Sequence, residues 1–375
     1  LQSAFSVQDL YPVHEVQVKV RDGVRIDPRT STATERAKYD YEVVEPPAVF
    51  CLKAEVTLRA AFKKEWFIAI IQYLIQALEQ GKISLGAMTT KGFGRCRLKN
   101  PRLNHYDYTN KEAVLAWFGE GDPVSIPIHT WDGPVLKEKE VQDFFLDAHF
   151  LLRSSLIVRK YIVRSNEPDA EHITSQGKPV LPGTSIKGAL RNRAEAIVNT
   201  LGGRGQEQLK QLFGWVDLEE KTKEKYKSRL IVEETVVENA VLCSQQRIRI
   251  DRFTGSTMHN ALFDEKPVWS TEEGHEQVRI KLRIRDCASW EAGLMLLLLK
   301  DLWTGDLPLG GEKSIGRGTL QGLRAEIAFG SQWFTLEEAP ETGLKVTGNR
   351  RTLEEFVAAF VREIREGGQQ HGAGV

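Results

Sequence analysis

The stretch Leu309–Gly318, LGGEKSIGRG, repeats the spacing of an earlier stretch, Leu85–Gly94, LGAMTTKGFG. Both stretches begin with Leu-Gly, both end with two glycines separated by one residue, and they lie 224 positions apart. Glycine tolerates positive φ angles and close backbone approach, so each stretch predicts a tight turn. A turn that recurs with its internal spacing indicates two copies of one fold in the chain.

The same offset superposes other features of the chain without a gap. Arg25-Ile26-Asp27 falls on Arg249-Ile250-Asp251, and Trp66 falls on Trp290. Further matches are Thr30 with Thr254, Ala37 with Ala261, Asp40 with Asp264, Val44 with Val268, Leu58 with Leu282 and Leu74 with Leu298. We therefore predict two homologous modules, 1–99 and 148–330, which are joined by a linker or insertion, 100–147, and followed by a C-terminal helical tail, 331–375.

The first module is expected to be incomplete. The second module begins near Ala148, and the offset places the corresponding start of the first module well before Leu1. The chain also begins with Leu rather than Met. We expect that an N-terminal portion of the first module is missing from this sequence, together with any catalytic residue that it holds.

Composition excludes several classes of protein. The 375 residues include 51 Lys and Arg against 51 Asp and Glu, 41% hydrophobic residues and 4 Cys. These values are typical of a folded chain of more than one domain and exclude disordered and disulfide-rich classes. Without a membrane-length apolar run or a signal peptide, we expect a cytoplasmic protein. A net charge of zero argues against a free-standing, nonspecific nucleic-acid binder.

The second module shows the order strand, helix, strands, helix, strand. Residue alternation predicts strands over 148–159 and 277–285, and apolar spacing predicts helices over 186–201 and 290–303. Thr184 or Ser185 is a natural cap for the first helix. Strands at 230–237 and 241–250 and a turn at 251–256 predict a long hairpin, and 318–327 predicts the final strand. This order favours an α+β, ferredoxin-like sandwich with a hairpin insertion.

Three stretches resemble the RAMP superfamily: PGTSIKGALR at 182–191, RIRIDRFTG at 247–255 and Leu309–Gly318. More narrowly, they look like the repeated backbone subunit of type III CRISPR RNA-guided effector complexes, in a tandem, double-module form. The resemblance implies two ferredoxin-like (RRM-like) RAMP modules, each with a hairpin insertion, or thumb, and a glycine-rich loop. It also implies a filament-like assembly with other CRISPR effector subunits, and this assembly holds guide RNA (crRNA). The thumb would interrupt the duplex between the guide RNA and complementary target RNA.

The candidate RNA-binding residues follow these motifs. Backbone amides at a helix start can receive a phosphate, alternate arginines on a strand share a face, and an apolar tip can wedge between bases. In the second module the candidates are Gly183, Thr184, Ser185, Lys187, Arg191, Arg247, Arg249, Arg252, Phe253, Gly310, Gly311, Lys313, Gly316 and Arg317. In the first they are Arg25, Arg29, Lys91 and Arg95. The alternative is that these residues form structural turns, caps and solvated strand faces.

The catalytic candidates lie in the polar loop 165–176. In the backbone subunits that this chain resembles, an aspartate between the first strand and the first helix is needed for metal-dependent cleavage of target RNA, and Asp169 is the residue in that place. Its expected role is to hold a divalent metal, Mg²⁺, or to help deprotonate the attacking ribose 2′-hydroxyl. His172 and Glu171 are the fallback candidates. The loop lacks the glycine-rich approach that is usual in the family.

Other functions remain open. A CRISPR repeat-processing endoribonuclease also pairs two ferredoxin-like folds, but it would use a histidine-centred site and act alone on free repeat RNA. A non-catalytic scaffold would hold guide RNA without cleaving the target. An unrelated phosphate-binding enzyme ranks last, because the sequence has no dinucleotide or nucleoside-triphosphate fingerprint.

Overall fold

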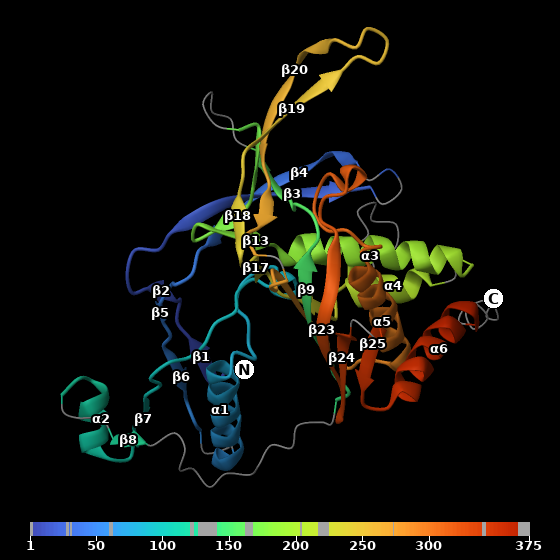
Figure 1. The fold of residues 1–375 in the computed structure, drawn as a ribbon. Helices are drawn as coiled ribbons and strands as arrows, with labels where there is room; N and C mark the ends of the chain where they lie inside the picture. The colour runs from blue at the N-terminus through green and yellow to red at the C-terminus, as the bar shows by residue number, and fades with distance from the viewer. Residues whose placement is uncertain are drawn as a thin grey trace, which may run out of the picture. The chain divides into compact units, whose positions relative to one another are not determined.

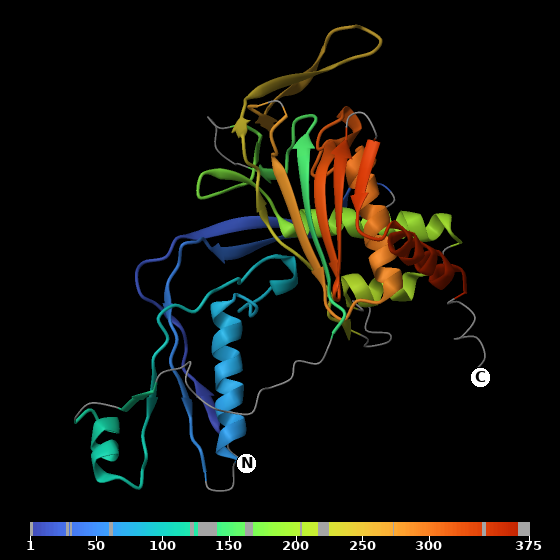
Figure 2. The ribbon, with the colours of Figure 1, turned by 60° about the horizontal axis from the view of Figure 1, so that its bottom comes forward.

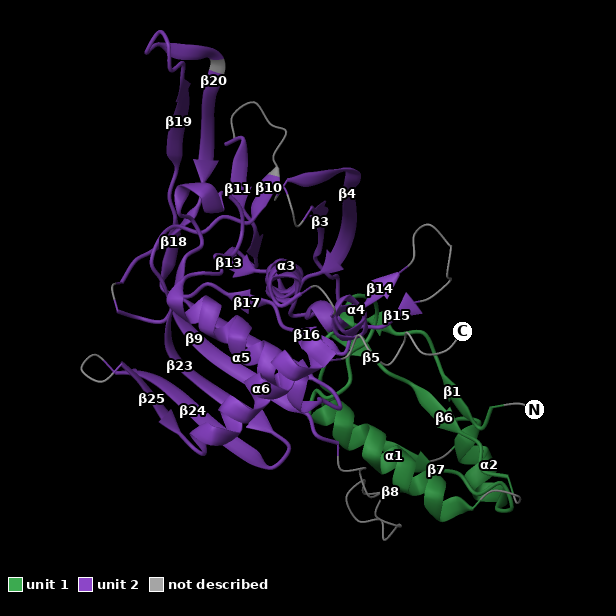
Figure 3. Ribbon diagram, turned by 90° about the vertical axis from the view of Figure 1, so that its right-hand side faces the viewer, with its two compact units in different colours: residues 1–13, 49–89, 93–140 green, residues 14–48, 90–92, 141–375 purple. Residues whose placement is uncertain are grey.

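The chain divides into two compact units, which are coloured separately in Figure 3. Unit 1 comprises residues 1–13, 49–89 and 93–140, and unit 2 comprises 14–48, 90–92 and 141–375. The computed structural model describes residues 3–27, 30, 32–59, 63–120, 124–126, 141–161, 168–202, 205–216, 225–272, 274–339 and 343–366. Within these ranges, no helix combines the length and the apolar composition that crossing a membrane requires.

A six-stranded antiparallel sheet organises unit 2. Its spatial order is β16 (Leu230–Val232), β22 (Val278–Ile284), β9 (Phe144–Leu152), β23 (Leu320–Phe329), β24 (Gln332–Ala339) and β25 (Gly343–Thr347). Along the chain, α3 (Gly183–Thr200) lies between β9 and β16, and α5 (Ser289–Thr304) lies between β22 and β23. These four strands and two helices form the ferredoxin-like order that the sequence predicts. The sheet is extended by β24 and β25, and the C-terminal helix α6 (Arg350–Glu366) packs against α5.

Residue alternation along the strands decides which face of the sheet is buried. In β9, Phe144, Leu146, Ala148, Phe150 and Leu152 are buried, whereas the residues between them are at least partly exposed. A strand directs alternate side chains to opposite faces, and the helices cover the apolar face (Figure 2). Since burial of one large apolar side chain contributes about 1.5–3 kcal/mol, this layer is the main stabilising element of unit 2.

The first helix of the second module begins earlier than the sequence predicts. Pro182 is the N-cap of α3 and makes no side-chain cap bond, so the prediction that Thr184 or Ser185 caps the helix is wrong. Proline fixes φ near the value that helix entry needs, and both hydroxyl residues therefore fall inside the first turn. The shorter elements of unit 2 are β10 (Arg159–Tyr161), β11 (Ala170–His172), β12 (Thr174–Ser175), β13 (Lys178–Leu181), α4 (Gln206–Phe213), β14 (Trp215–Val216), β15 (Lys225–Tyr226), β17 (Thr235–Val236), β18 (Ala240–Leu242), β21 (Val268–Ser270) and the 3-10 turn η2 (Lys313–Ile315).

A long hairpin projects from unit 2 (Figures 1 and 2). It consists of β19 (Gln245–Ile250) and β20 (Thr257–Lys266), and its pairing register shifts between Ile248 and Ile250. At the tip, the carboxylate of Asp251 accepts hydrogen bonds from the amides of Phe253 and Thr254 at 2.8 and 2.9 Å. The aspartate thereby closes the turn that the sequence predicts.

The first copy forms a hairpin of the same register, which belongs to unit 2. It consists of β3 (Val18–Ile26) and β4 (Ala33–Val44). Each strand pair from Arg21–Tyr41 to Ile26–Ala33 lies 224 positions before a strand pair of the β19–β20 hairpin, and the register shift recurs between Val24 and Ile26. The common register confirms the predicted duplication.

Unit 1 contains further counterparts of the second module. Helix α1 (Lys64–Glu79) lies 224 positions before α5 to within one residue at each end. The 3-10 turn η1 (Thr89–Lys91), of which residues 90 and 91 belong to unit 2, lies 224 positions before η2. The amide of Leu85 donates to Gly94 at 2.9 Å, as that of Leu309 donates to Gly318 at 3.0 Å. Three short ladders and one helix complete this unit: β1 (Phe5–Val7) with β6 (Ala54–Val56), β2 (Tyr11–Pro12) with β5 (Phe50–Cys51), β7 (Leu103–His105) with β8 (Val124–Ile126), and α2 (Lys111–Trp117).

Candidate nucleic-acid interface

The glycine turn of the second module closes onto the chain that leaves β9. The amide of Gly311 donates to the carbonyl oxygen of Ile157, and that of Gly318 donates to Ser155, both at 2.7 Å. Gly318 has φ +75°, and a Cβ there would overlap the carbonyl of Leu309, so only glycine fits. Gly316 instead has open space around it and is exposed, so a sugar-phosphate backbone can approach the turn there.

The preceding glycine of this turn also packs against the protein. A Cβ on Gly310, whose φ is +82°, would meet the carbonyl oxygen of Ile157 and the side chain of Leu156. Lys313, which follows in η2, is exposed. The predicted RNA-binding set of this turn therefore divides into packed positions, Gly310 and Gly311, and outward positions, Lys313 and Gly316.

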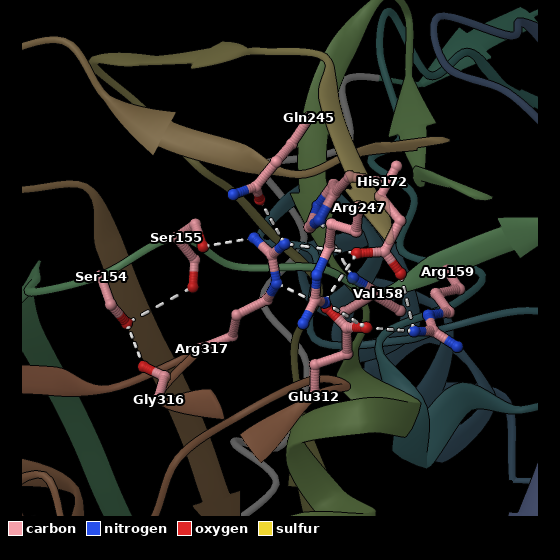
Figure 4. Close-up of polar contacts among 11 residues, drawn as sticks. Ser154, Ser155, Val158, Arg159, His172, Gln245, Arg247, Glu312, Gly316 and Arg317 are labelled. Carbon is pink, nitrogen blue, oxygen red and sulfur yellow. Dashed lines mark hydrogen bonds and ion pairs between the residues drawn. The ribbon is translucent and has the colours of Figure 1, made fainter. Parts of the chain in front are cut away.

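A cluster of charged side chains lies at the root of the β19–β20 hairpin (Figure 4). At its centre is Arg317, which is 3% exposed. Arg317 bonds Glu312 at 2.6 Å, Gln245 at 2.6 Å and Glu265 at 3.3 Å, and it also donates to the Ser155 hydroxyl. The arginine thus contacts the turn, both hairpin strands and the segment after β9.

Two further arginines complete this cluster. Arg159 bonds Glu265 at 2.8 Å and Glu312 at 2.6 Å, and Arg247 bonds Glu312 at 3.0 Å and Glu265 at 3.2 Å (Figure 4). Burial would raise the pKa of Glu312, but the bonded partners, Arg317 among them, hold it below its ordinary value. We call the set Ser155, Arg159, Gln245, Arg247, Glu265, Glu312 and Arg317 the root cluster. Two predicted RNA-binding residues, Arg247 and Arg317, are therefore bonded to carboxylates of the protein itself.

Beyond its root, the hairpin presents cations and apolar side chains to solvent. Arg249 and Arg252 are exposed, and Phe253 at the tip is 100% exposed. The other exposed large apolar residues of the hairpin are Ile248, Ile250, Met258 and Leu262. Arginines suit backbone phosphates and an apolar tip can wedge between bases, so the outer hairpin is chemically suited to RNA.

The start of α3 is packed rather than open. Gly183 is buried, and a Cβ there would overlap the carbonyl oxygen of Lys91 and lie 2.6 Å from that of Val232. Lys91 belongs to the glycine turn of the first copy, so the backbone of that turn occupies the helix start. Thr184 and Ser185 are half-buried beside it. The phosphate site that the sequence predicts at this position is thus filled by protein atoms.

Lys187 and Arg191 serve the interior of the second module. Lys187 is 7% exposed, and its Nζ donates to the Ser228 hydroxyl at 2.6 Å and to the Leu230 carbonyl at 2.8 Å. Burial lowers the pKa of Lys187 to about 7. Arg191 bonds Glu195 at 3.0 Å and the Gly214 carbonyl at 3.1 Å. These bonds give both Lys187 and Arg191 a structural role, and they make Lys187 unsuited to the predicted phosphate contact.

Asp169 lies beside the hairpin strand β20. Its side chain is exposed, and its Oδ2 accepts a hydrogen bond from the amide of Asp264 at 2.9 Å. Glu171 is half-buried and pairs with Lys266 at 3.2 Å. The segment 162–167, which contains most of the predicted catalytic loop before Asp169, lies outside the described residues. Of the three catalytic candidates, Asp169 is the most exposed.

His172 is a structural histidine. It is 1% exposed, and its Nδ1 accepts from the amide of Val158 at 3.1 Å (Figure 4). Its Nε2 donates to the carbonyl of Val180 at 2.9 Å. Burial lowers the pKa of His172 to about 4, so the ring is neutral near pH 7. With both nitrogens bonded to the backbone, His172 is unsuited to proton transfer.

Asp169 could hold a magnesium ion if RNA phosphates and water supplied the remaining ligands. The described part of the chain holds no group of three or more His, Cys, Asp or Glu side chains arranged for a metal. Mg²⁺, however, commonly binds one or two carboxylates and takes its remaining ligands from water and substrate phosphates. Oδ1 of Asp264 is buried without a hydrogen-bond partner among the described residues, and it lies on the residue whose amide binds Asp169. The exposed carboxylate of Asp169 is compatible with Mg²⁺ once a phosphate is present.

The first hairpin docks on the second module through its charged root. Arg21 is buried and pairs with Glu45 at 3.2 Å and with Glu234. Glu45 in turn accepts from the Ser175 hydroxyl at 2.8 Å and the Gln176 amide at 2.9 Å. Burial alone would raise the pKa of Glu45, but these bonds hold it below its ordinary value.

The predicted RNA-binding residues of the first copy are placed as follows. Arg25 is exposed on β3, Lys91 is half-buried in η1, and Arg95 is exposed after the turn in unit 1. Arg29 lies outside the described residues. Arg25 and Arg249 are equivalent through the 224-residue offset, so each hairpin carries one exposed arginine at the same register position.

Comparison with protein families bears on both modules. The family model for the RAMP superfamily matches residues 2–97 and 117–321, which is well over half of the chain. The chain belongs to the RAMP superfamily. Both hairpins and both glycine turns of this RAMP protein fall within the matched segments, in agreement with a tandem fusion. No protein with a curated description matches the chain. Membership of the RAMP superfamily indicates a CRISPR-associated protein that binds RNA.

The acidic half of the root cluster is absent from the sequence predictions for this RAMP protein. Alternation along the strand predicts that Gln245 and Arg247 share a face. It does not predict that Glu312 joins them, because a glutamate between turn glycines is expected to be solvated. Glu312 departs from that expectation because its φ is +55° and its side chain meets three arginines. Its counterpart Met88 has φ +56°, so the backbone shape belongs to the motif and the charge to the second copy alone.

Proposed function

We propose that this RAMP protein is a backbone subunit of a type III CRISPR effector complex and that it binds guide RNA through both of its modules. The observation that carries the proposal is a repeat: two hairpins share one strand-pairing register, and each is followed in the chain by the same glycine turn. The two copies lie 224 positions apart. Repeated elements in one chain suit a ligand that is itself a repeating sugar-phosphate strand.

The outer hairpin supplies the chemistry for this contact. Exposed Arg249 and Arg252 can neutralise phosphates, and exposed Phe253 can wedge into a stack of bases. The exposed Gly316 offers close approach at the glycine turn. The docking of the first hairpin on the second module supports a head-to-tail arrangement of such modules, because contacts of this type continue into filaments when further modules are added.

We further propose that Asp169 takes part in cleavage of the target RNA that pairs with the guide. When bound, Mg²⁺ would stabilise negative charge on the phosphorane. Asp169, oriented by the Asp264 amide, would hold the ion or accept the proton of the ribose 2′-hydroxyl. The 2′-oxygen then bonds to the adjacent phosphorus, the bond from phosphorus to the 5′-oxygen breaks, and that oxygen takes up a proton.

One experiment separates the candidate functions. The assembled complex is purified, its RNA is sequenced, and labelled complementary RNA is added with Mg²⁺. We expect a defined small RNA and cuts at regular intervals. Asp169→Asn is expected to reduce cutting at this module's position by about a hundredfold or more, with guide RNA retained, because one positioned acid-base group contributes about 10²–10⁴. Glu272→Gln, an exposed carboxylate elsewhere, is the matched control.

The other outcomes each favour a different function. Bound guide RNA without cutting by the wild-type complex favours the non-catalytic scaffold. Cutting of free repeat RNA by the isolated chain favours the repeat-processing enzyme. His172 is buried and neutral, so it is unsuited to be the catalytic histidine of such an enzyme. If Asp169→Asn leaves every cut in place, the assignment of Asp169 is wrong.

A further inference from the structure

We propose that Arg317 is a positioning residue that fixes the direction of the β19–β20 hairpin, and not an RNA ligand. The hairpin leaves unit 2 as a free arm (Figures 1 and 2), so its direction depends on the contacts at its root. The parallel pairing of β20 with β11 and the root cluster supply these contacts. Within the cluster, Arg317 bonds the glycine turn, the hairpin and the segment after β9 (Figure 4).

The bonds of Arg317 hold both hairpin strands at a single rung. Gln245 and Glu265 are partners in the strand register, and Nη2 of Arg317 bonds both of them. Nε bonds Glu312 of the glycine turn, and Nη1 bonds Ser155 after β9. A guanidinium group is planar and presents its donors in a rigid fork, so these bonds define an orientation as well as a distance.

Burial separates Arg317 from any phosphate. Its side chain is almost fully enclosed, and each of its three nitrogens already donates to a protein oxygen. Arg159 and Arg247, which share the same two carboxylates, have about 32% and 26% of their side chains exposed. Of the three arginines in the cluster, Arg159 and Arg247 contact solvent, whereas Arg317 is buried.

The first hairpin is held at its root by different contacts. The positions equivalent to Gln245, Glu265, Glu312 and Arg317 hold Arg21, Tyr41, Met88 and Phe93. The first hairpin therefore lacks this ion cluster, and its Arg21 instead binds Glu45 of the first copy and Glu234 of the second module. One hairpin is fixed by docking on a neighbouring module, and the other is fixed by a brace within its own module.

The length of the arm makes the brace important for function. Ten residues of β20 span roughly 30 Å, so a rotation of about 10° at the root would move the tip by about 5 Å. This displacement approaches the spacing of neighbouring nucleotides in an extended strand. The consequence for RNA rests on the proposed function: Arg317 sets the nucleotide at which Phe253 enters the guide-target duplex.

The first test needs no RNA. Spin labels are placed at Phe253→Cys and Glu354→Cys in a chain whose Cys51, Cys96 and Cys243 are serine, and the label-to-label distance distribution is measured by double electron-electron resonance. We expect one narrow distribution for Arg317 and at least a twofold wider one for Arg317→Met. The variant is expected to fold, because two arginines and two glutamates remain in balance. Arg324→Met, on the neighbouring strand β23 and half exposed, is the matched control and should not widen it.

An unchanged width in folded Arg317→Met overturns the proposal. If that variant fails to fold, Gln245→Leu removes one acceptor of Arg317 without altering any charge, and an unchanged width for Gln245→Leu has the same meaning. A second measurement concerns the complex: Arg317→Met should spread target cuts over neighbouring nucleotides, with guide RNA affinity altered less than about threefold. If the wild-type complex contains no RNA, the proposed function fails, whereas the spin-label result still decides the role of Arg317.

Discussion

The Nε2 atom of His172 lies 2.9 Å from the carbonyl oxygen of Val180, inside the core of the second module. Since burial lowers the pKa of His172 from 6.5 to about 4, the unfolded chain binds more protons than the folded chain between these pH values. The free energy of unfolding should therefore fall as pH is lowered from 6.5 to 4, by up to about 3 kcal/mol from this group. Urea unfolding of the wild type and His172→Gln across this range is the measurement, with His275→Gln as the exposed control. Equal pH dependence in wild type and His172→Gln would contradict the assignment.

Lys187 should make the free energy of unfolding depend on pH in a higher range than His172 does. Burial lowers its pKa from 10.5 to about 7, so the unfolded chain binds the extra proton between pH 7 and 10.5 and stability from this group rises with pH there. Lys187→Met removes the charge and its burial cost. The loss of stability caused by this substitution should therefore grow from pH 7 to pH 9.5, by roughly 3 kcal/mol. Chemical denaturation at both pH values tests this, and a constant difference would show that Lys187 is not the group responsible.

The paired turn glycines should respond alike in the two copies. A Cβ on Gly94 or Gly318 would overlap the carbonyl of Leu85 or Leu309, at φ +71° and +75°. Gly94→Ala and Gly318→Ala should each lower the free energy of unfolding by at least about 2 kcal/mol, since strain and overlap add. Gly316→Ala, at φ +88° with open space around it, is the control and should cost about 1 kcal/mol. Thermal unfolding of all three separates overlap from conformational strain, and equal losses would remove the steric argument.

The hairpin arginines should divide into two groups. Arg249→Ala and Arg252→Ala should each weaken RNA binding and reduce the slope of log affinity against log salt by about 1, with stability unchanged, because both side chains are exposed. Arg247→Ala should instead destabilise the fold, because Glu265 and Glu312 lose a partner. Filter binding at several salt concentrations, together with thermal melts, distinguishes the groups. An unchanged salt slope for Arg249→Ala and Arg252→Ala would exclude them as phosphate contacts.

Local pattern was sufficient to predict the repeated elements. The 224-residue offset places both hairpins, the helices α1 and α5 and both glycine turns, because each depends on residues close together in sequence. The α+β fold class also follows from element order. The assignment of the first hairpin to unit 2 does not follow, because homology between copies carries no information on which module a segment contacts.

The candidate site was predicted less completely, and for one physical reason. Lys187, His172 and Arg317 are residue types that often bind ligands, but each is buried and bonded to protein atoms here. Burial arises from segments far apart in the chain, as when Glu312, Glu265 and Ser155 surround one guanidinium group. Outward positions such as Arg249, Phe253 and Asp169 are exposed, because no distant segment encloses them, and their roles stay predictions.

The docking of the first hairpin has a consequence for assembly. Arg21 and Glu45 meet Glu234 and Ser175 within one polypeptide, so their encounter is governed by the covalent tether and not by the amount of protein in solution. A junction made in this way withstands dilution, whereas the same junction between separate chains would dissociate. Joining the two modules therefore guarantees their one-to-one stoichiometry and their order before any other subunit arrives.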